Sequence, residues 1–178
     1  MKFIKILFFV LALVFLGYLF LPDPDFPIPP ADALQSFEPA DTETSLRRGY
    51  YTNLTRDEIM THYLSQLTKS TFLNIPLPTY RLNYPPEEAQ TIIRDQTKST
   101  FLEEIVHPFR ESVYINGYEP KDVKIPVESG GRSWRQKIIV RQVPSRVWLR
   151  VFLGLLTLIA IFVLFREYRQ FPRPRKVI

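Results

Sequence analysis

The chain has 178 residues, of which 46% are hydrophobic and 23% charged, a composition typical of a protein that folds around one core. It contains no cysteine and only two histidines, which excludes a disulfide framework, thiol catalysis, cysteine-ligated metal clusters and a three-histidine metal site. The net charge is +5, but the excess cations flank two apolar runs at the ends of the chain. Residues 23–145 carry more acids than bases, so a nucleic-acid-binding surface is not expected.

The first apolar run covers residues 3–21 and contains one charge, Lys5, which makes it long enough to predict a membrane-spanning helix. A cleaved signal peptide would begin in the same way, but the run ends at Pro22 without the small residues of a cleavage site. We therefore predict that residues 1–21 are a retained signal anchor. Cations precede the run and residues 22–46 contain none, a pattern that places the amino terminus in the cytoplasm.

Residues 22–45 are rich in proline and acidic side chains. Five prolines occur between Pro22 and Pro30, and residues 23–43 contain six acids and no base. Dense proline favours an extended polyproline II helix, and like charges along a segment oppose its collapse. We expect a stiff stalk here, with a docking motif for an aromatic groove as the alternative.

An amphipathic helix is expected after residue 55. Thr55 can cap it, because Asp57 and Glu58 then occupy the first turn and favour the helix dipole. A stripe at helical spacing follows, made of Ile59, Tyr63, Leu64 and Leu67. Thr55 also completes the glycosylation acceptor Asn53-Leu54-Thr55, but the capping role explains it more economically.

A second helix is expected to begin at the double proline 85–86, with Glu87 and Glu88 in its first turn. One apolar side is formed by Ala89, Ile92, Ile93 and Gln96, and after a bend near Ser99 a second stripe is formed by Leu102, Ile105, Val106 and Phe109. The hexapeptide Thr-Lys-Ser-Thr-Phe-Leu occurs at both 68–73 and 97–102. The repeat arose either by duplication of a helix–strand unit or by chance, and both explanations stay open.

The remaining central residues favour β-strands. Tyrosine and leucine alternate with polar residues over 80–84, and Asn116-Gly117 is the dipeptide of a two-residue hairpin turn. A further turn is expected at 129–132, and residues 133–143 form the longest strand candidate. Together with the two helices, these strands predict an α+β extracytoplasmic domain of antiparallel strands over residues 46–145.

The second apolar run predicts a carboxy-terminal transmembrane helix over residues 146–165. Arg150 lies one turn inside this run, where its guanidinium can reach the headgroups, and Trp148 and Tyr168 lie near its two ends, as interfacial aromatic residues do. A basic tail follows at 166–178. We expect both termini in the cytoplasm and residues 22–145 outside it.

The candidates for chemistry are weak. Glu104 and His107 have the Glu-x-x-His spacing of di-iron bundles, but that site needs a second such motif, and Glu58 and His62 are one residue too far apart. The pairs Asp57-Glu58 and Glu87-Glu88 could serve acid–base catalysis, yet acids are also favoured in first helical turns. Ser129-Gly-Gly could hold an anion through backbone N–H groups, although a plain turn explains it. We predict no catalytic, cofactor-binding or metal-ligating residue.

The tyrosines of the central domain fit either the rim of a core or a contact surface; they are Tyr50, Tyr51, Tyr63, Tyr80, Tyr84, Tyr114 and Tyr118. The leading expectation is a non-enzymatic module for interaction or assembly in the cell envelope, in contact with the lipid bilayer and with a protein partner or a second copy. The layout of two spans around an external domain resembles that of the polysaccharide chain-length regulators of bacterial envelopes, without a shared motif. That resemblance implies an oligomeric regulator of polysaccharide length or export. A third expectation is an extracytoplasmic hydrolase using Glu103, Glu104 or His107.

Overall fold

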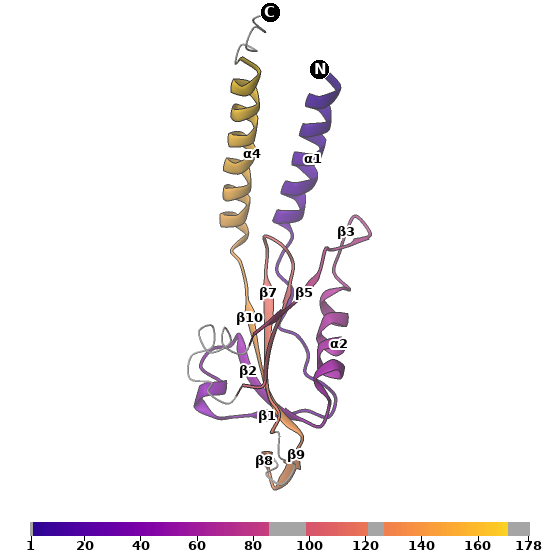
Figure 1. Ribbon diagram of the computed structural model, residues 1–178, viewed down its shortest axis with the longest axis vertical. Coiled ribbons are helices and arrows are strands. Elements are labelled where there is room, and N and C mark those ends of the chain that lie inside the picture. The colour runs from indigo at the N-terminus through magenta and orange to yellow at the C-terminus, as the bar shows by residue number, and fades with distance from the viewer. Residues whose placement is uncertain (1, 86–98, 121–126, 171–178) are drawn as a thin grey trace, which may run out of the picture. The chain divides into compact units, whose positions relative to one another are not determined.

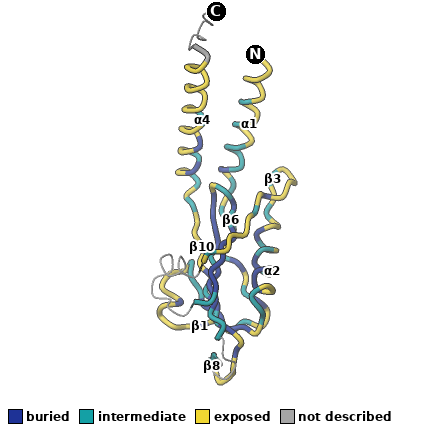
Figure 2. Tube along the Cα trace, in the orientation of Figure 1, coloured by how far each residue is buried: buried dark blue, intermediate teal, exposed yellow. Residues whose placement is uncertain are grey.

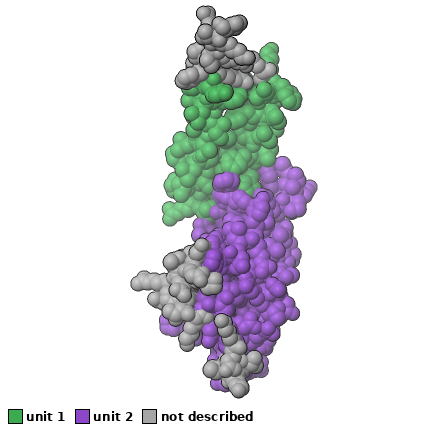
Figure 3. Space-filling view, viewed as in Figure 1, with its two compact units in different colours: residues 1–22, 145–178 green, residues 23–144 purple. Residues whose placement is uncertain are grey.

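The computed structural model describes residues 2–85, 99–120 and 127–170, with side chains described as far as residue 168. The chain forms two compact units, shown in different colours in Figure 3. One unit joins Met1–Pro22 to Ser145–Ile178 and contains both long apolar helices. The other unit, Asp23–Pro144, contains all the described strands and the helix α2 (Arg56–Leu67).

The central feature of the second unit is a six-stranded antiparallel sheet with the strand order β1-β2-β10-β7-β6-β5 (Figure 1). Its strands are β1 (Leu34–Ser36), β2 (Arg47–Thr52), β5 (Tyr80–Tyr84), β6 (Phe101–Val106), β7 (Ser112–Tyr118) and β10 (Gln136–Val143). Two short hairpins lie outside the sheet and pair β3 (Thr71–Phe72) with β4 (Ile75–Pro76), and β8 (Val127–Ser129) with β9 (Arg132–Trp134). The predicted α+β class with antiparallel strands is confirmed.

Helix α2 covers one face of this sheet and supplies four of the eleven described buried residues of the core cluster. It begins as predicted, because Thr55 and Glu58 form a complete capping box, which satisfies two N–H groups at the start of the helix. Its buried side is Ile59, Met60, Tyr63 and Leu67. These side chains pack in one cluster with sheet residues that include Tyr50, Ile105, Ile115 and Ile138, the dark blue region of the central domain in Figure 2.

The helical stripe predicted at 102–109 is wrong, since residues 101–106 form strand β6 between β5 and β7. Five successive residues of β6, from Phe101 to Ile105, are buried. A strand buried on both faces shows no alternation of apolar and polar residues, so its sequence cannot be distinguished from a buried helix by periodicity. The first part of the second predicted helix, at 86–98, lies outside the described residues.

The hairpin turn predicted at Asn116-Gly117 is also wrong, because both residues lie inside β7. Gly117 pairs with Phe101 on one side and with Ile138 on the other. A Cβ atom at Gly117 would lie 2.0 Å from the Phe101 ring, so the glycine makes room for an aromatic side chain of the core. The connection between β6 and β7 is the segment 107–111.

Residues 23–45, expected to form a separate stalk, belong to the folded unit. Leu34–Ser36 form β1 and pair with β2 at the edge of the sheet. The backbone N–H of Ile28 donates to the side chain of Gln66 in α2, at 2.8 Å. The groups that hold this proline-rich segment against the domain come from distant parts of the chain.

The first unit consists of α1 (Lys2–Phe20) and α4 (Val147–Gln170). Both helices are long and apolar enough to cross a membrane, as predicted, and most of their side chains are exposed (Figure 2). They approach closely at Gly154, where an added Cβ would lie 2.5 Å from the side chain of Leu19. Small residues allow this kind of close helix contact in membranes.

Candidate functional site

The three residues considered for hydrolysis, Glu103, Glu104 and His107, do not form one site. Glu103 and Glu104 are successive residues of β6, so their side chains project from opposite faces of the sheet. His107 lies beyond the end of that strand. Each of the three therefore has its own set of partners.

Glu103 is a buried carboxylate held between two arginines, on the face of the sheet that carries α2. Its Oε1 accepts from Arg56 Nε at 2.5 Å and from Arg81 Nη2 at 2.8 Å, while its Oε2 accepts from Arg81 Nε. Burial raises the pKa of Glu103, but the hydrogen bonds from Arg81 and Arg56 outweigh this and leave its pKa below the usual value. The same hydrogen bonds raise the pKa of Arg81. This network ties α2 to β5 and β6.

Glu104 faces the other side of the sheet, next to Tyr84 and Tyr114. The Tyr84 hydroxyl donates to Glu104 Oε2, and the two tyrosine rings lie 6.2 Å apart. The hydrogen bond to Glu104 raises the pKa of Tyr84, and burial followed by the charge of Glu104 raises that of Tyr114. Both phenols therefore stay protonated near neutral pH, and that of Tyr84 donates to Glu104.

His107 is fully buried in an arrangement that has the connectivity of a hydrolase triad. Its Nδ1 lies 2.6 Å from Glu111 Oε1, and its Nε2 lies 3.1 Å from Thr79 Oγ1. The Thr79 hydroxyl, however, donates its proton to the carbonyl of Leu77 at 3.0 Å. A nucleophile must donate to the base that activates it, so this hydroxyl is not arranged for attack.

Glu111 also accepts from Arg110 Nε, at 3.0 Å. Burial raises its pKa, but the hydrogen bonds from His107 and Arg110 outweigh burial and leave the pKa below its usual value. The whole group joins the β6–β7 connection to the segment before β5. The geometry supports a structural role for these side chains, which hold the two segments together.

The paired acids of the first helical turn do not act together. Glu58 belongs to the capping box, and hydrogen bonds from Thr55 lower its pKa. The Asp57 side chain is 89% exposed, and its Oδ1 lies 3.7 Å from Arg81 Nη2. His62 contacts the backbone carbonyl of Ile28 at 2.9 Å, and no group of three metal-ligating side chains occurs among the described residues.

Of the two remaining candidates, Glu87 and Glu88 lie outside the described residues, and the other forms no site. Ser129-Gly-Gly is the turn of the β8–β9 hairpin, where Gly130 and Gly131 both have positive φ. The Ser129 carbonyl accepts from the Trp134 indole N–H at 3.0 Å. This segment is therefore a turn, as its simpler explanation predicted.

Exposed apolar side chains occur on the β3–β4 hairpin and on β5, and the sequence patterns did not single them out as a group. They are Leu73, Ile75, Tyr80 and Leu82, which are 71%, 66%, 57% and 43% exposed; we call these four residues together the edge surface. Strand β5 is the last strand of the sheet on this side, and no described strand pairs with its outer edge. Exposed apolar groups beside an open strand edge are typical of protein contact sites.

The tyrosines of the domain divide between core and surface. Tyr50, Tyr51 and Tyr63 are buried, Tyr84, Tyr114 and Tyr118 are half-buried, and Tyr80 belongs to the edge surface. Burial raises the pKa of Tyr63 well above its usual value. Most of these residues therefore serve the fold, and one is free to contact a partner.

Arg150 is a structural residue whose partners the sequence did not reveal. Its guanidinium donates to the backbone carbonyls of Leu19, at 2.5 Å, and of Leu21. It also donates to Ser145 Oγ at 2.9 Å. The last carbonyls of a helix have no partner within the helix and carry its negative dipole end, so a buried cation from α4 caps the end of α1.

Comparison with known proteins found no matching protein family, no similar curated sequence and no similar solved structure.

Proposed function

We propose that this chain is an integral membrane protein that presents a small α+β domain outside the cytoplasm as a non-enzymatic interaction module. The observation that carries the proposal is the edge surface. It offers exposed apolar side chains and a strand edge with which no described strand pairs, in a domain whose candidate catalytic groups are each held by other side chains.

The ends of the domain support attachment to the membrane through both helices. Gln142 Nε2 donates to the carbonyl of Pro24 at 2.7 Å, so the two points at which the chain leaves Asp23–Pro144 lie side by side. A domain built in this way can be held by two neighbouring helices. Lys2 and Lys5 before the first helix favour a cytoplasmic amino terminus by the positive-inside rule, which would place the domain on the opposite side.

The polar clusters support a binding role over hydrolysis. The negative charge of Glu103 is balanced by two arginines, and His107 is fully buried. A general base, however, must lie within hydrogen-bond distance of a substrate proton. The edge surface, in contrast, is open to a partner. Addition of a partner strand to an exposed sheet edge is a common mode of recognition, with affinity from backbone hydrogen bonds and specificity from alternate side chains.

In-cell photo-cross-linking tests this proposal. A benzophenone side chain at Leu82 should give an adduct with one identifiable protein, and the substitution Ile75→Asp should weaken that adduct. The matched control carries the same probe at Thr61, an exposed position of α2, and should give none. Adducts of equal yield at both positions, or no adduct at Leu82, would contradict the proposal. An adduct with a second copy of the chain would identify the partner as a homo-oligomer.

A further inference from the structure

Two apolar cavities lie between α1 and α4 in the first unit. One cavity of about 460 Å³ is lined by both helices, and its lining includes Lys5, Phe8, Phe162, Phe165 and Arg166. A second cavity of about 310 Å³ shares Phe8, Phe9 and Phe162 with the first and continues to Leu16 and Leu155. The two cavities together form a groove along the helix pair.

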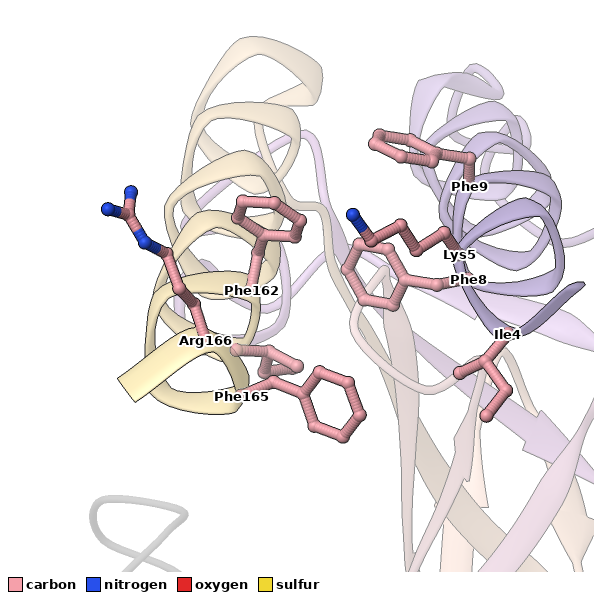
Figure 4. Close-up of a pocket in the computed structure, with 8 residues that line it drawn as sticks. Ile4, Lys5, Phe8, Phe9, Phe162, Phe165 and Arg166 are labelled. Carbon is pink, nitrogen blue, oxygen red and sulfur yellow. The ribbon is translucent and has the colours of Figure 1, made fainter. Parts of the chain in front are cut away.

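The groove is polar at one end and apolar along the rest. Figure 4 shows Phe8, Phe162 and Phe165 between the two helices, with Lys5 extending from α1 toward α4 and Arg166 directed away from α1. Lys5 makes no ion pair with any described residue. From Lys5 to Leu16 the groove extends about 16 Å along the helix axis, at 1.5 Å per residue, and its lining in this stretch is aliphatic or aromatic.

We propose that this groove is a binding site for one anionic glycerophospholipid of the cytoplasmic leaflet. The phosphate lies at Lys5, with Arg166 at the rim, and an acyl chain follows the apolar groove toward Leu16. Charge complementarity favours this occupant, because a cation that enters the membrane interface is stabilised by an anionic headgroup. A third apolar helix would fill the groove but would leave the Lys5 ammonium unmatched in a place of low polarity.

The site rests on the proposal that both helices span the membrane, and a fluorescence experiment separates the two claims. The full chain with Trp134→Phe, Trp148→Phe and Phe162→Trp carries its single indole in the groove. It is reconstituted into phosphatidylcholine vesicles that contain either brominated phosphatidylglycerol or brominated phosphatidylcholine. Bromine quenches indole fluorescence on contact, so the ratio of quenching reports the preference of the groove for the anionic lipid.

We expect phosphatidylglycerol to be preferred about fivefold, the effect of one cation beside an anionic lipid, and Lys5→Gln to reduce the preference to about one. Lys5→Arg should retain it. Lys2→Gln is the matched control, since Lys2 is exposed on the same helix and does not line the groove, and it should also retain the preference. Equal quenching by both lipids in the parent chain, or a preference unchanged by Lys5→Gln, would overturn the site.

Trp148 provides the independent readout for membrane insertion. A chain with Trp134→Phe alone keeps Trp148, which is exposed near the start of α4, and lipid brominated high on its acyl chains should quench it. Quenching of Trp148 without quenching at position 162 would mean that protein fills the groove, and would overturn the lipid site while leaving the spans intact. Absence of quenching at both positions would overturn the membrane-spanning proposal itself.

Discussion

At the scale of single residues, the fold depends on charges that are buried and matched. Glu103 is surrounded by Arg56 and Arg81, so its ionised form is stabilised in the folded protein and its pKa is lowered there. A carboxyl group with a lowered folded-state pKa contributes stability above its unfolded-state pKa, and that contribution disappears as the pH falls through the folded-state value. The contribution of Glu103 is therefore complete at pH 7 and is lost below about pH 4.5.

Replacement of this carboxylate should reveal that dependence. We expect Glu103→Gln to lower the free energy of unfolding at pH 7 by about 1.5–3 kcal/mol, the range for hydrogen bonds to charged groups. The difference between the variant and the parent should shrink as the pH falls from 5 to 3, because the parent then loses the same charge. Denaturant titration of the full chain in mild detergent, followed by tryptophan fluorescence, measures both quantities.

Glu119→Gln is the control for this experiment. Glu119 pairs with Arg135 at 2.7 Å, but both side chains are partly exposed, and exposed pairs contribute about 0–1 kcal/mol. A destabilisation by Glu103→Gln that stayed constant between pH 7 and pH 3 would contradict the assigned role of the ionised carboxylate.

At the scale of elements, α1 and α4 are joined by a long-range cap in addition to their packing at Gly154. Arg150 reaches the carbonyls at the end of α1, more than a hundred residues earlier in the chain. In a hydrocarbon environment an unpaired carbonyl or guanidinium is unfavourable. The cap therefore stabilises the helix pair at the end where Gly154 permits close approach.

Loss of the cap should loosen the pair. Spin labels at Phe3→Cys and Leu164→Cys, two exposed positions in a chain without native cysteine, report the distance between the helices by electron spin resonance. We expect Arg150→Gln to broaden this distance distribution, and Arg150→Lys to have an intermediate effect because an ammonium lacks the planar fork of donors. Arg146→Gln, at an exposed neighbouring position, should leave the distribution unchanged. An unchanged distribution in Arg150→Gln would show that helix packing alone holds the pair.

The elements that the sequence predicted poorly share a physical cause. Strand β6 is buried on both faces, so it lacks the alternation by which a strand is recognised. Gly117 looks like part of a turn because glycine is common in turns, but here it gives space to the Phe101 ring. Both assignments depend on neighbours that are distant in the sequence.

At the scale of the whole molecule, the topology determines which compartment the edge surface faces. We expect a membrane-impermeant maleimide, applied to intact cells or to spheroplasts where there is an outer membrane, to label Phe37→Cys. The same reagent should not label Val177→Cys until the membrane is permeabilised, because the basic residues at 166–176 favour the cytoplasm. Phe37 is 80% exposed, so its labelling reports the compartment.

A second exposed position, Glu128→Cys in β8, tests another part of the same domain and should behave like Phe37→Cys. Labelling of Val177→Cys on intact cells, with both domain positions protected, would invert the topology and place the edge surface in the cytoplasm.

The sequence by itself determined the features that depend on local pattern. The two long apolar helices, the helix cap at Thr55 and the α+β class follow from run length, spacing and residue type within short windows, and the structure confirms all three. Only the tertiary structure decided which groups balance the charge of Glu103, where residues 23–45 pack and what Arg150 binds. These depend on contacts between residues separated by tens to more than a hundred positions, and the pattern of one segment does not encode which distant segment will lie beside it.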